Sequence, residues 1–298
     1  MRNFYPGKIL LYGEYSVVLK HRALAIPLIS QGGGWDYTNG ADNKTLYGWM
    51  EYLKNLSNAS EYNLKLFEED LSKGLFFKST LPQGYGAGSS GALVAAFYSS
   101  YSKSFYTKAS DTRLLDLKKE LGLLESYFHG SSSGTDPLVS LLNHSLLLTQ
   151  NQVNKIKLPS PPNNLIFFLL DCGNARKTEP LVNKFLNDIK TNQSYVSEFE
   201  KRYIPKVEQT IQCHIQGNFA ELKQLWLDLS LSQPYFFSAM IPDKVKKVWY
   251  KGNEEGHTHL KLCGAGGGGY LLGLSHLSEK EISLFYPDYK IIPLPFSS

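Results

Sequence analysis

The chain has 298 residues, which at about 150 residues per domain predicts two domains, and its 42% hydrophobic content excludes a disordered or fibrous protein. Its 31 Lys and Arg against 27 Asp and Glu leave a net charge of +4 with no run of five like charges, which argues against a nucleic-acid partner. The longest apolar run of note, residues 165–170, is far shorter than the roughly 20 residues that span a bilayer, so we expect no membrane partner. Because Glu14 also comes too early for a signal peptide, we expect a cytoplasmic protein.

The three cysteines, Cys172, Cys213 and Cys263, lie far apart, with no CxxC pair and no paired histidine spacing. This pattern excludes a disulfide framework and a zinc site, and we expect buried thiols.

The N-terminal half mixes strand-like and helical segments without a regular βαβ order, which predicts an α+β fold. A turn-rich loop is expected over residues 32–42, and helices over 89–101 and 111–128. The second helix repeats leucine at Leu114, Leu117, Leu121 and Leu124, which marks one buried face. Strands are expected over residues 8–12, 17–19, 23–30, 75–79 and 145–149.

A proline cluster at residues 159–162, inside the segment 151–164, is the best linker candidate, because these prolines can continue neither a helix nor a central strand. We therefore predict domains over residues 1–157 and 158–298. Beyond the boundary we expect a strand over 165–171, helices over 178–190, 195–215, 219–231 and from 242, and a strand–glycine–strand segment over 259–274.

The segment LPQGYGAGSSGA, residues 81–92, places Gly84, Gly86 and Gly88 before an apolar helix. A helix N-terminus behind a loop without Cβ atoms can hold a phosphate group, because its N–H groups point outward and the backbone can approach the anion. A Walker A loop is excluded, since no Gly-Lys-Ser/Thr follows. A tight turn in which Ser89 or Ser90 caps the helix remains the simpler alternative.

The same segment satisfies GxGxxG through Gly86, Gly88 and Gly91, with Asp111 twenty residues further on, so a dinucleotide-binding fold must be weighed. The signal is weak, because two residues separate the glycines from the preceding strand. The N-terminal half also lacks the repeated βαβ units of that fold.

Further candidate residues lie in three other segments. Lys8 follows Pro-Gly at the start of a strand, where a lysine is usually solvated. The GAGGGG segment at residues 264–269 joins two strands with more glycine than a structural hairpin needs. Glu125 is in the last helical turn, where the helix dipole disfavours a carboxylate unless a cation is near. Asp136 precedes Pro137 and could equally be a helix N-cap. His129 is expected to be packed or hydrogen-bonded rather than a ligand.

Taken in order, PGKILLYGEYSVV, LPQGYGAGSSGA, ESYFHGSSSGTD and KLCGAGGGGYLLGL resemble the GHMP kinase superfamily, and its mevalonate kinase branch most closely. The resemblance covers most of the chain. It implies a two-domain GHMP kinase fold, with a ribosomal-protein-like α+β domain followed by a ferredoxin-like domain and an active site between them. It also implies an ATP- and Mg²⁺-dependent kinase acting on a small-molecule alcohol, as a monomer or homodimer.

The resemblance assigns roles to individual residues. Asp136 would accept or orient the proton of the substrate hydroxyl, and Lys8 would stabilise charge on the transferring phosphoryl group. Ser90 and Glu125 would hold Mg²⁺. The nucleotide phosphates would be bound by Gly84, Gly86, Ala87, Gly88, Ser89 and Ser90. The acceptor would be faced by Glu14, Tyr15, Thr178, Ala265 and Gly266.

Two departures from the family pattern stand out. GEY at residues 13–15 replaces the GEH of mevalonate kinases and matches phosphomevalonate kinases, and GAGSSGA at residues 86–92 places Ala87 and Gly91 where the family reads GLGSSAA. The GAGGGG motif favours the mevalonate branch. If mevalonate is the substrate, Tyr15 would donate a neutral hydrogen bond to it, while Lys8 or Arg176 would meet its carboxylate. The alternatives are a phosphomevalonate kinase, another GHMP small-molecule kinase, or a nucleotide-binding regulatory protein without turnover.

Overall fold

The computed structural model describes residues 4–104, 111–173 and 178–296, and its strands form two separate antiparallel sheets. The first sheet has five strands in the order β1-β2-β4-β5, with β3 pairing with β2. We call the part of the chain up to β5 the N-terminal lobe, and the part from β6 onward the C-terminal lobe. The strands of the first sheet are β1 Tyr5–Tyr12, β2 Ala23–Tyr37, β3 Leu75–Ser79, β4 Ser145–Leu148 and β5 Val153–Ile156.

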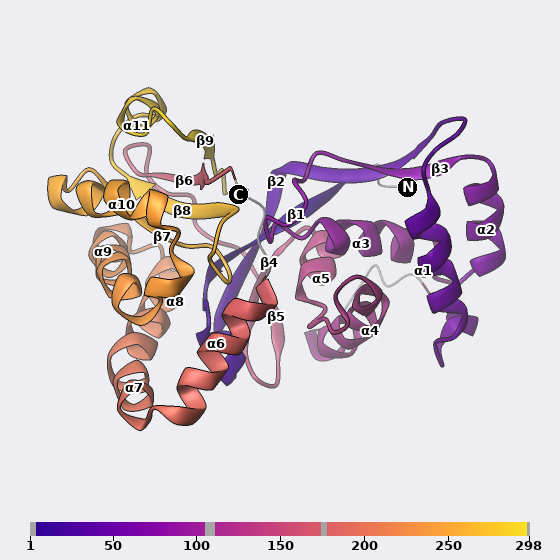
Figure 1. The fold of residues 1–298 in the computed structure, drawn as a ribbon, viewed down its shortest axis with the longest axis horizontal. Coiled ribbons are helices and arrows are strands. Elements are labelled where there is room, and N and C mark those ends of the chain that lie inside the picture. The colour runs from indigo at the N-terminus through magenta and orange to yellow at the C-terminus, as the bar shows by residue number, and fades with distance from the viewer. Residues whose placement is uncertain (1–3, 105–110, 174–177, 297–298) are drawn as a thin grey trace.

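Helices cover one face of the N-terminal sheet, and β1 and β2 run between the two lobes (Figure 1). Helices α3 and α5 pack directly on β1 and β2, and α4 packs against both of these helices and against β5. The sequence of α3 is apolar on every side, which suits a helix buried between a sheet and two other helices. The helical segments are η1 Ser16–Leu19, α1 Lys44–Lys54, η2 Ala59–Glu61, α2 Leu64–Ser72, α3 Ser89–Tyr101, α4 Asp111–His129 and α5 Thr135–Leu142.

The second sheet has the strand order β7-β8-β6-β9. With helices between β6 and β7 and between β8 and β9, its chain order is βαββαβ, which is the ferredoxin-like arrangement that was predicted. The strands are β6 Ile166–Asp171, β7 Thr258–Leu262, β8 Tyr270–Ser275 and β9 Lys290–Pro293. The helical segments are α6 Thr178–Thr191, α7 Gln193–Glu198, η3 Phe199–Tyr203, α8 Ile204–Gln216, α9 Phe219–Phe236, η4 Ser238–Met240, α10 Asp243–Glu255 and α11 Glu279–Phe285.

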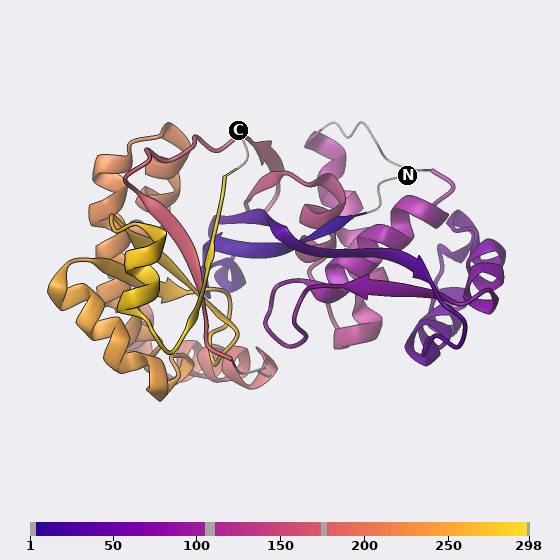
Figure 2. The ribbon, with the colours of Figure 1, turned by 90° about the horizontal axis from the view of Figure 1, so that it is seen from above.

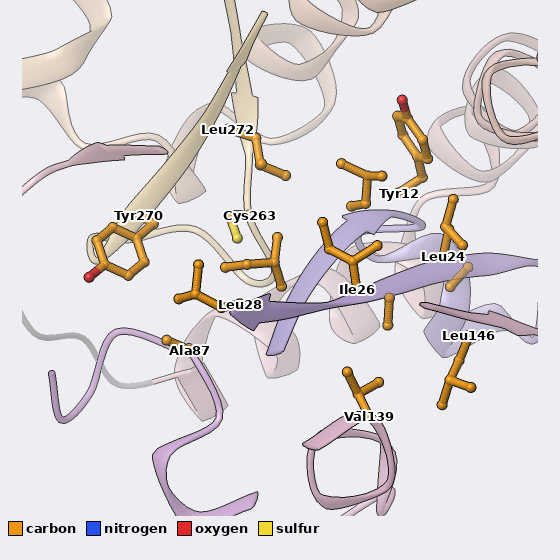
Figure 3. Packing of buried hydrophobic residues seen from close by; sticks show 14 of the residues in the cluster. Tyr12, Leu24, Ile26, Leu28, Ala87, Val139, Leu146, Cys263, Tyr270 and Leu272 are labelled. Atoms are coloured by element: carbon orange, nitrogen blue, oxygen red, sulfur yellow. The ribbon is translucent and has the colours of Figure 1, made fainter. Parts of the chain in front are cut away.

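The two lobes lie side by side (Figure 2) and share one hydrophobic core. Figure 3 shows Tyr270, Leu272 and Cys263 of the C-terminal lobe on the side of β2 that carries Ile26, while Val139 of α5 lies on its other side. All three cysteines are free and buried, as expected. Within the described residues, no helix combines the length and apolarity needed to cross a bilayer.

Two predicted elements of the N-terminal lobe are wrong. Residues 32–42 were expected to form a loop, but β2 continues through the glycines to Tyr37. A Cβ at Gly32 would lie 2.3 Å from the Tyr5 oxygen, and one at Gly33 would lie 2.5 Å from the Phe77 ring, so these glycines let β2 approach both neighbouring strands. Residues 17–19 form the 3₁₀ helix η1 instead of a strand, because Tyr15 turns the chain with φ of 62°.

Two predictions for the region after residue 150 are also wrong. The expected linker 151–164 contains β5, which extends the first sheet before the prolines begin. The expected helix 195–215 is interrupted by η3, a π-helical turn just before Pro205 in the first turn of α8. The described strands pair antiparallel throughout, which rules out the parallel dinucleotide-binding sheet.

Candidate active site

The glycine-rich segment before α3 forms an open loop over the helix N-terminus. Gly84, Gly86 and Gly88 all have positive φ, between 70° and 75°, and Gly88 is the N-cap residue of α3. No side chain caps this helix, so the alternative in which Ser89 or Ser90 is the N-cap is wrong. The first N–H groups of α3 therefore remain available to an anion.

The loop is fixed to β1 beside Lys8. The Lys8 N–H donates a hydrogen bond to the Ala87 oxygen at 2.9 Å. A Cβ at Gly7 would lie 2.5 Å from the same oxygen, so only glycine fits there. The Pro-Gly-Lys sequence thus places the Lys8 side chain next to the helix N-terminus, and Lys8 is not the solvated strand residue that such a position usually holds.

Glu125, near the end of α4, is a buried carboxylate that accepts hydrogen bonds on both oxygens. Ser90 Oγ donates to Oε1 at 2.8 Å, and the Ser132 hydroxyl donates to Oε2. His129 Nε2 lies 2.8 Å from Ser90 Oγ, which agrees with the expected hydrogen-bonded role of this histidine. Burial, together with the charge of Asp136, raises the pKa of Glu125 to about 7, and the hydroxyl hydrogen bonds only partly offset this.

Lys8 and Asp136 form an ion pair with 2.7 Å between Nζ and Oδ1. Helix α5 begins at Thr135 with Gly134 as its N-cap, so Asp136 is within the first turn and does not have the N-cap role that was considered. Burial by itself would lower the pKa of Lys8, but Asp136, together with Cys263 and Glu125, outweighs it and the pKa is raised. The lysine is therefore held in its charged form beside the carboxylate.

Glycine at position 91 of α3 makes room for Asp136. A Cβ at Gly91 would lie 2.7 Å from the Asp136 backbone carbon, whereas a Cβ at the N-cap residue Gly88 would make only an ordinary contact with Asp136 Oδ2 at 3.4 Å. Gly91 is one of the departures from the family pattern, and here it lets α5 pack close to the start of α3. Ser90, Glu125, Lys8 and Asp136 are consequently brought together around one helix N-terminus.

The glycine loop, which we define as residues 264–269, folds back between the two lobes. Gly264, Gly266, Gly267, Gly268 and Gly269 all have positive φ. A Cβ at Gly266 would lie 2.3 Å from the Met240 oxygen, and one at Gly269 would lie 2.6 Å from the Tyr85 oxygen. The glycines are therefore needed for close backbone contact with η4 on one side and with the loop before α3 on the other.

The residues predicted to face the acceptor differ in their surroundings. Glu14 and Tyr15 are both buried; Glu14 pairs with Lys261, and the Tyr15 hydroxyl donates to the Ala265 oxygen at 2.6 Å. Thr178 is the first residue of α6, and its side chain lies outside the described part of the structure, as does Arg176.

A cavity of about 670 Å³ opens beside the glycine loop, within the C-terminal lobe. Neither the Lys8–Asp136 pair nor Ser90 and Glu125 line it, so it is distinct from the helix N-terminus that could hold phosphate. Its lining consists of Pro180, Leu181, Ser238, Ala239, Ile241, Pro242, Asp243, Lys246 and Gly267.

Sequence reasoning missed three polar residues near this centre. Ser132 donates to Glu125, and a signal for it existed in the serine run after the glutamate. Lys118 on α4 is close enough to Asp136 to interact with its charge, although burial lowers the pKa of this lysine. Lys261 is wholly buried. The sequence feature that could have pointed to it is a single lysine within the apolar strand that leads into the glycine loop.

Comparison with known proteins gives consistent results. The family model for the GHMP kinases N terminal domain matches residues 49–144. The mevalonate kinase of Pyrococcus abyssi is 22% identical, with 93% of this chain and 89% of the relative covered. The structure of L. major mevalonate kinase in complex with R-mevalonate has a TM-score of 0.68 at 17% identity, covering 100% of this chain and 97% of that chain. Streptococcus pneumoniae phosphomevalonate kinase in complex with phosphomevalonate and AMPPNP has a TM-score of 0.65 at 13% identity, with 97% and 98% covered.

The two-domain α+β fold matches that of these kinases, as predicted, and the family model assigns residues 49–144 to the GHMP kinases N terminal domain. The chain is thus similar to the GHMP kinases near their mevalonate kinase branch, since the curated relatives that align with 93% of it carry that name.

Proposed function

We propose that the chain transfers the γ-phosphoryl group of ATP to the hydroxyl group of mevalonate, giving 5-phosphomevalonate. The observation that carries the proposal is the Lys8–Asp136 ion pair, with 2.7 Å between its atoms, beside the uncapped N-terminus of α3. The names of the relatives favour mevalonate as the acceptor, because mevalonate kinases align over 93% of the chain.

The loop before α3 is suited to the nucleotide phosphates. The N–H groups of Gly86, Ala87, Gly88 and the two serines can approach an anion, with Gly84 supplying the turn. Ser90 and Glu125 would hold Mg²⁺ together with the phosphates, since Mg²⁺ prefers oxygen ligands and uses few protein groups at such sites. This agrees with the described residues, which contain no group of three or more acidic, His or Cys ligands. The ion would neutralise charge on the phosphate oxygens.

Asp136 is placed to accept or orient the proton of the acceptor hydroxyl, because its carboxylate lies in the first turn of α5 at the start of α3. Lys8 holds a positive charge there and can stabilise charge on the transferring group. Ala265 and Gly266 bring the backbone of the glycine loop to the acceptor side. Phosphoryl transfer needs mainly such positioning and electrostatic stabilisation.

Phosphomevalonate is the second candidate acceptor. The GEY sequence and the structural likeness to a phosphomevalonate kinase favour it. A second phosphate on the acceptor would require several cationic groups. Among the described residues, Lys8 and Lys118 are the cations that interact with Asp136, and Lys8 is already paired. Mevalonate therefore remains the first choice.

The proposal is tested by measuring ADP release from ATP·Mg²⁺ with mevalonate, phosphomevalonate, homoserine and galactose as acceptors. We expect mevalonate to give the highest kcat/KM. A kcat/KM at least about tenfold higher for phosphomevalonate would reverse the order of the two candidates. Tight ATP binding without acceptor-dependent ADP release would instead identify a nucleotide-binding regulatory protein.

Asp136→Asn tests the catalytic pair. We expect kcat to fall by about 10²- to 10⁴-fold, the range for a positioned general base, with little change in ATP affinity. Asp116→Asn, an exposed aspartate on α4, is the matched control and should leave both unchanged. Normal turnover combined with a lower Tm in Asp136→Asn would show that Asp136 only stabilises α5.

A further inference from the structure

A buried ion pair joins the two lobes next to the active site. Glu14 lies just after β1, and Lys261 is the residue before the last in β7. The Lys261 ammonium donates to Glu14 Oε1 at 2.5 Å and to the Leu262 oxygen at 2.9 Å. The exposed fractions of the two side chains are 1% and 0%, so solvent does not reach the pair.

Aromatic rings enclose the remaining side of the lysine. Its Nζ lies 5.7 Å from the centre of the Tyr12 ring and 5.4 Å from that of Trp226, within the range of cation–π attraction. Burial raises the pKa of Glu14, and Lys261 offsets part of this effect. Desolvation makes such a pair poor evidence of stabilisation, whereas removal of one partner leaves a buried charge and is strongly unfavourable. The pair therefore specifies how the lobes meet rather than simply stabilising them.

Tyr15, the next residue, makes a second contact between the lobes. Its φ of 62° is unusual for a bulky side chain and must be maintained by its surroundings. The ring stacks on Phe237, with 4.7 Å between centroids, and packs against Phe185 at 4.8 Å. Its hydroxyl donates to the Ala265 oxygen at 2.6 Å. The aromatic contacts and this hydrogen bond thus attach the turn after β1 to the glycine loop.

Both contacts connect the same two catalytic parts of the chain. Lys8 is on β1, ahead of Glu14 and Tyr15, and Lys261 is three residues before the glycine loop begins. We propose that Glu14, Lys261 and Tyr15 are positioning residues that set the glycine loop against the Lys8–Asp136 pair and that neither Glu14 nor Tyr15 touches the acceptor. This inference rests on the proposed function only for its activity measurements, since the contacts themselves affect folding.

The ion pair is tested with Glu14→Met, Lys261→Met and the double variant carrying both substitutions. Each single variant should lose about 10 °C in Tm and at least about tenfold in kcat, because a charge is left buried without a partner. The double variant has no buried charge and similar volume, so Tm and kcat/KM for mevalonate should both recover to near wild type. Arg22→Met is the matched control, because Arg22 pairs with Glu208 across the lobes while remaining about one-third exposed, and its effect should be small.

Tyr15→Phe tests the second contact and is expected to fold normally. As a positioning residue, Tyr15 should affect kcat, with a loss of about tenfold and acceptor KM within about twofold of wild type. A tenfold rise in acceptor KM at unchanged kcat would mean that the hydroxyl contacts the acceptor and would overturn the inference for Tyr15. A double Met variant that regains its Tm but stays inactive would overturn it for Glu14.

The two failures are distinguishable. If the wild type phosphorylates none of the alcohols, the proposed function fails, and the inference is then decided by the melting temperatures alone. In that case a double Met variant that melts as low as the single variants overturns it, and recovery of Tm supports it.

Discussion

At the residue scale, Glu125 is a carboxylate in surroundings that disfavour negative charge. A carboxylate in the last turn of α4 faces the negative end of the helix dipole, and it is also almost completely buried. Hydroxyl groups from Ser90 and Ser132 donate to it, yet burial keeps its pKa near 7. A bound cation such as the proposed Mg²⁺ would favour the ionised carboxylate.

Glu125→Gln and Ser90→Ala should each raise the Mg²⁺ concentration needed for half-maximal rate, because each removes an oxygen ligand from a hard cation. The measurement is ADP release as a function of free Mg²⁺. Ser99→Ala, near the other end of α3, is the control for Ser90→Ala and should leave the Mg²⁺ dependence unchanged. An unaltered Mg²⁺ dependence in Glu125→Gln would mean that this carboxylate is only a residue of the helix end.

The candidate site could be predicted in part from motifs. Local sequence drew attention to Glu125 and Asp136, whereas Lys8 and Ser90 were assigned to the site through the family resemblance. The structure places all four around the N-terminus of α3. Lys261 was missed because a single lysine in an apolar strand suggests a solvated edge position. Its burial depends on a carboxylate far away in the sequence, and no local pattern reports such a pairing.

At the element scale, helix α8 brings a neutral histidine into the contact between the lobes. His214 Nδ1 lies 2.8 Å from the Tyr12 hydroxyl oxygen, and the ring stacks on Phe167. Its Nε2 is buried without a partner in the described structure. Burial lowers the pKa of His214 from 6.5 to about 3, so the folded protein keeps the ring neutral.

Between pH 6.5 and pH 3 the unfolded chain binds a proton at His214 and the folded chain does not. Protonation therefore favours the unfolded chain, and the free energy of unfolding decreases as the pH falls through this range. From pH 7 to pH 5 the loss amounts to about 2 kcal/mol in the free energy of unfolding. His214→Gln retains an acceptor for Tyr12 but cannot titrate, and it should remove that part of the pH dependence in urea unfolding. The exposed His144→Gln is the control. Parallel pH profiles for wild type and His214→Gln would contradict the assignment.

Element boundaries show where local patterns are insufficient. Glycine-rich residues 32–34 suggest a loop, yet they form the middle of β2 because two neighbouring strands approach their backbone closely. The α3 and α4 helices were predictable from their hydrophobic pattern. The π-helical turn η3 was not, because it depends on packing of Phe199 and Tyr203 against Phe237 and Phe236 rather than on helical propensity.

At the scale of the whole molecule, the lobes are joined by polar and apolar contacts. Tyr270 of β8 donates to Gln31 Oε1 of β2 at 3.0 Å, and Arg22 pairs with Glu208 of α8. The shared core on the Ile26 side of β2 adds apolar burial between the same parts (Figure 3). Because the shared core is buried between the lobes, unfolding of one lobe would expose apolar surface of the other.

We therefore expect the lobes to unfold in one cooperative transition. Labelling with 5-fluorotryptophan gives each lobe its own probes: Trp35 and Trp49 report on the N-terminal lobe, and Trp226 and Trp249 on the C-terminal lobe. Their fluorine signals, assigned by single Trp→Phe variants, should disappear with the same midpoint in urea. Separate midpoints for the two pairs would show that the lobes are independently stable.

The turn after β1 also limits how the chain can be divided or recombined. Although Tyr12, Glu14 and Tyr15 precede the C-terminal lobe by about 150 residues, they complete its interior through His214, Lys261 and Ala265. The C-terminal lobe therefore cannot be cut out intact, since its excision would remove Glu14, the carboxylate that pairs with the buried Lys261. A chimera between two relatives would have to take residues 12–15 and the C-terminal lobe from the same parent. The part that must be exchanged as a whole is therefore made of two separate stretches of the sequence.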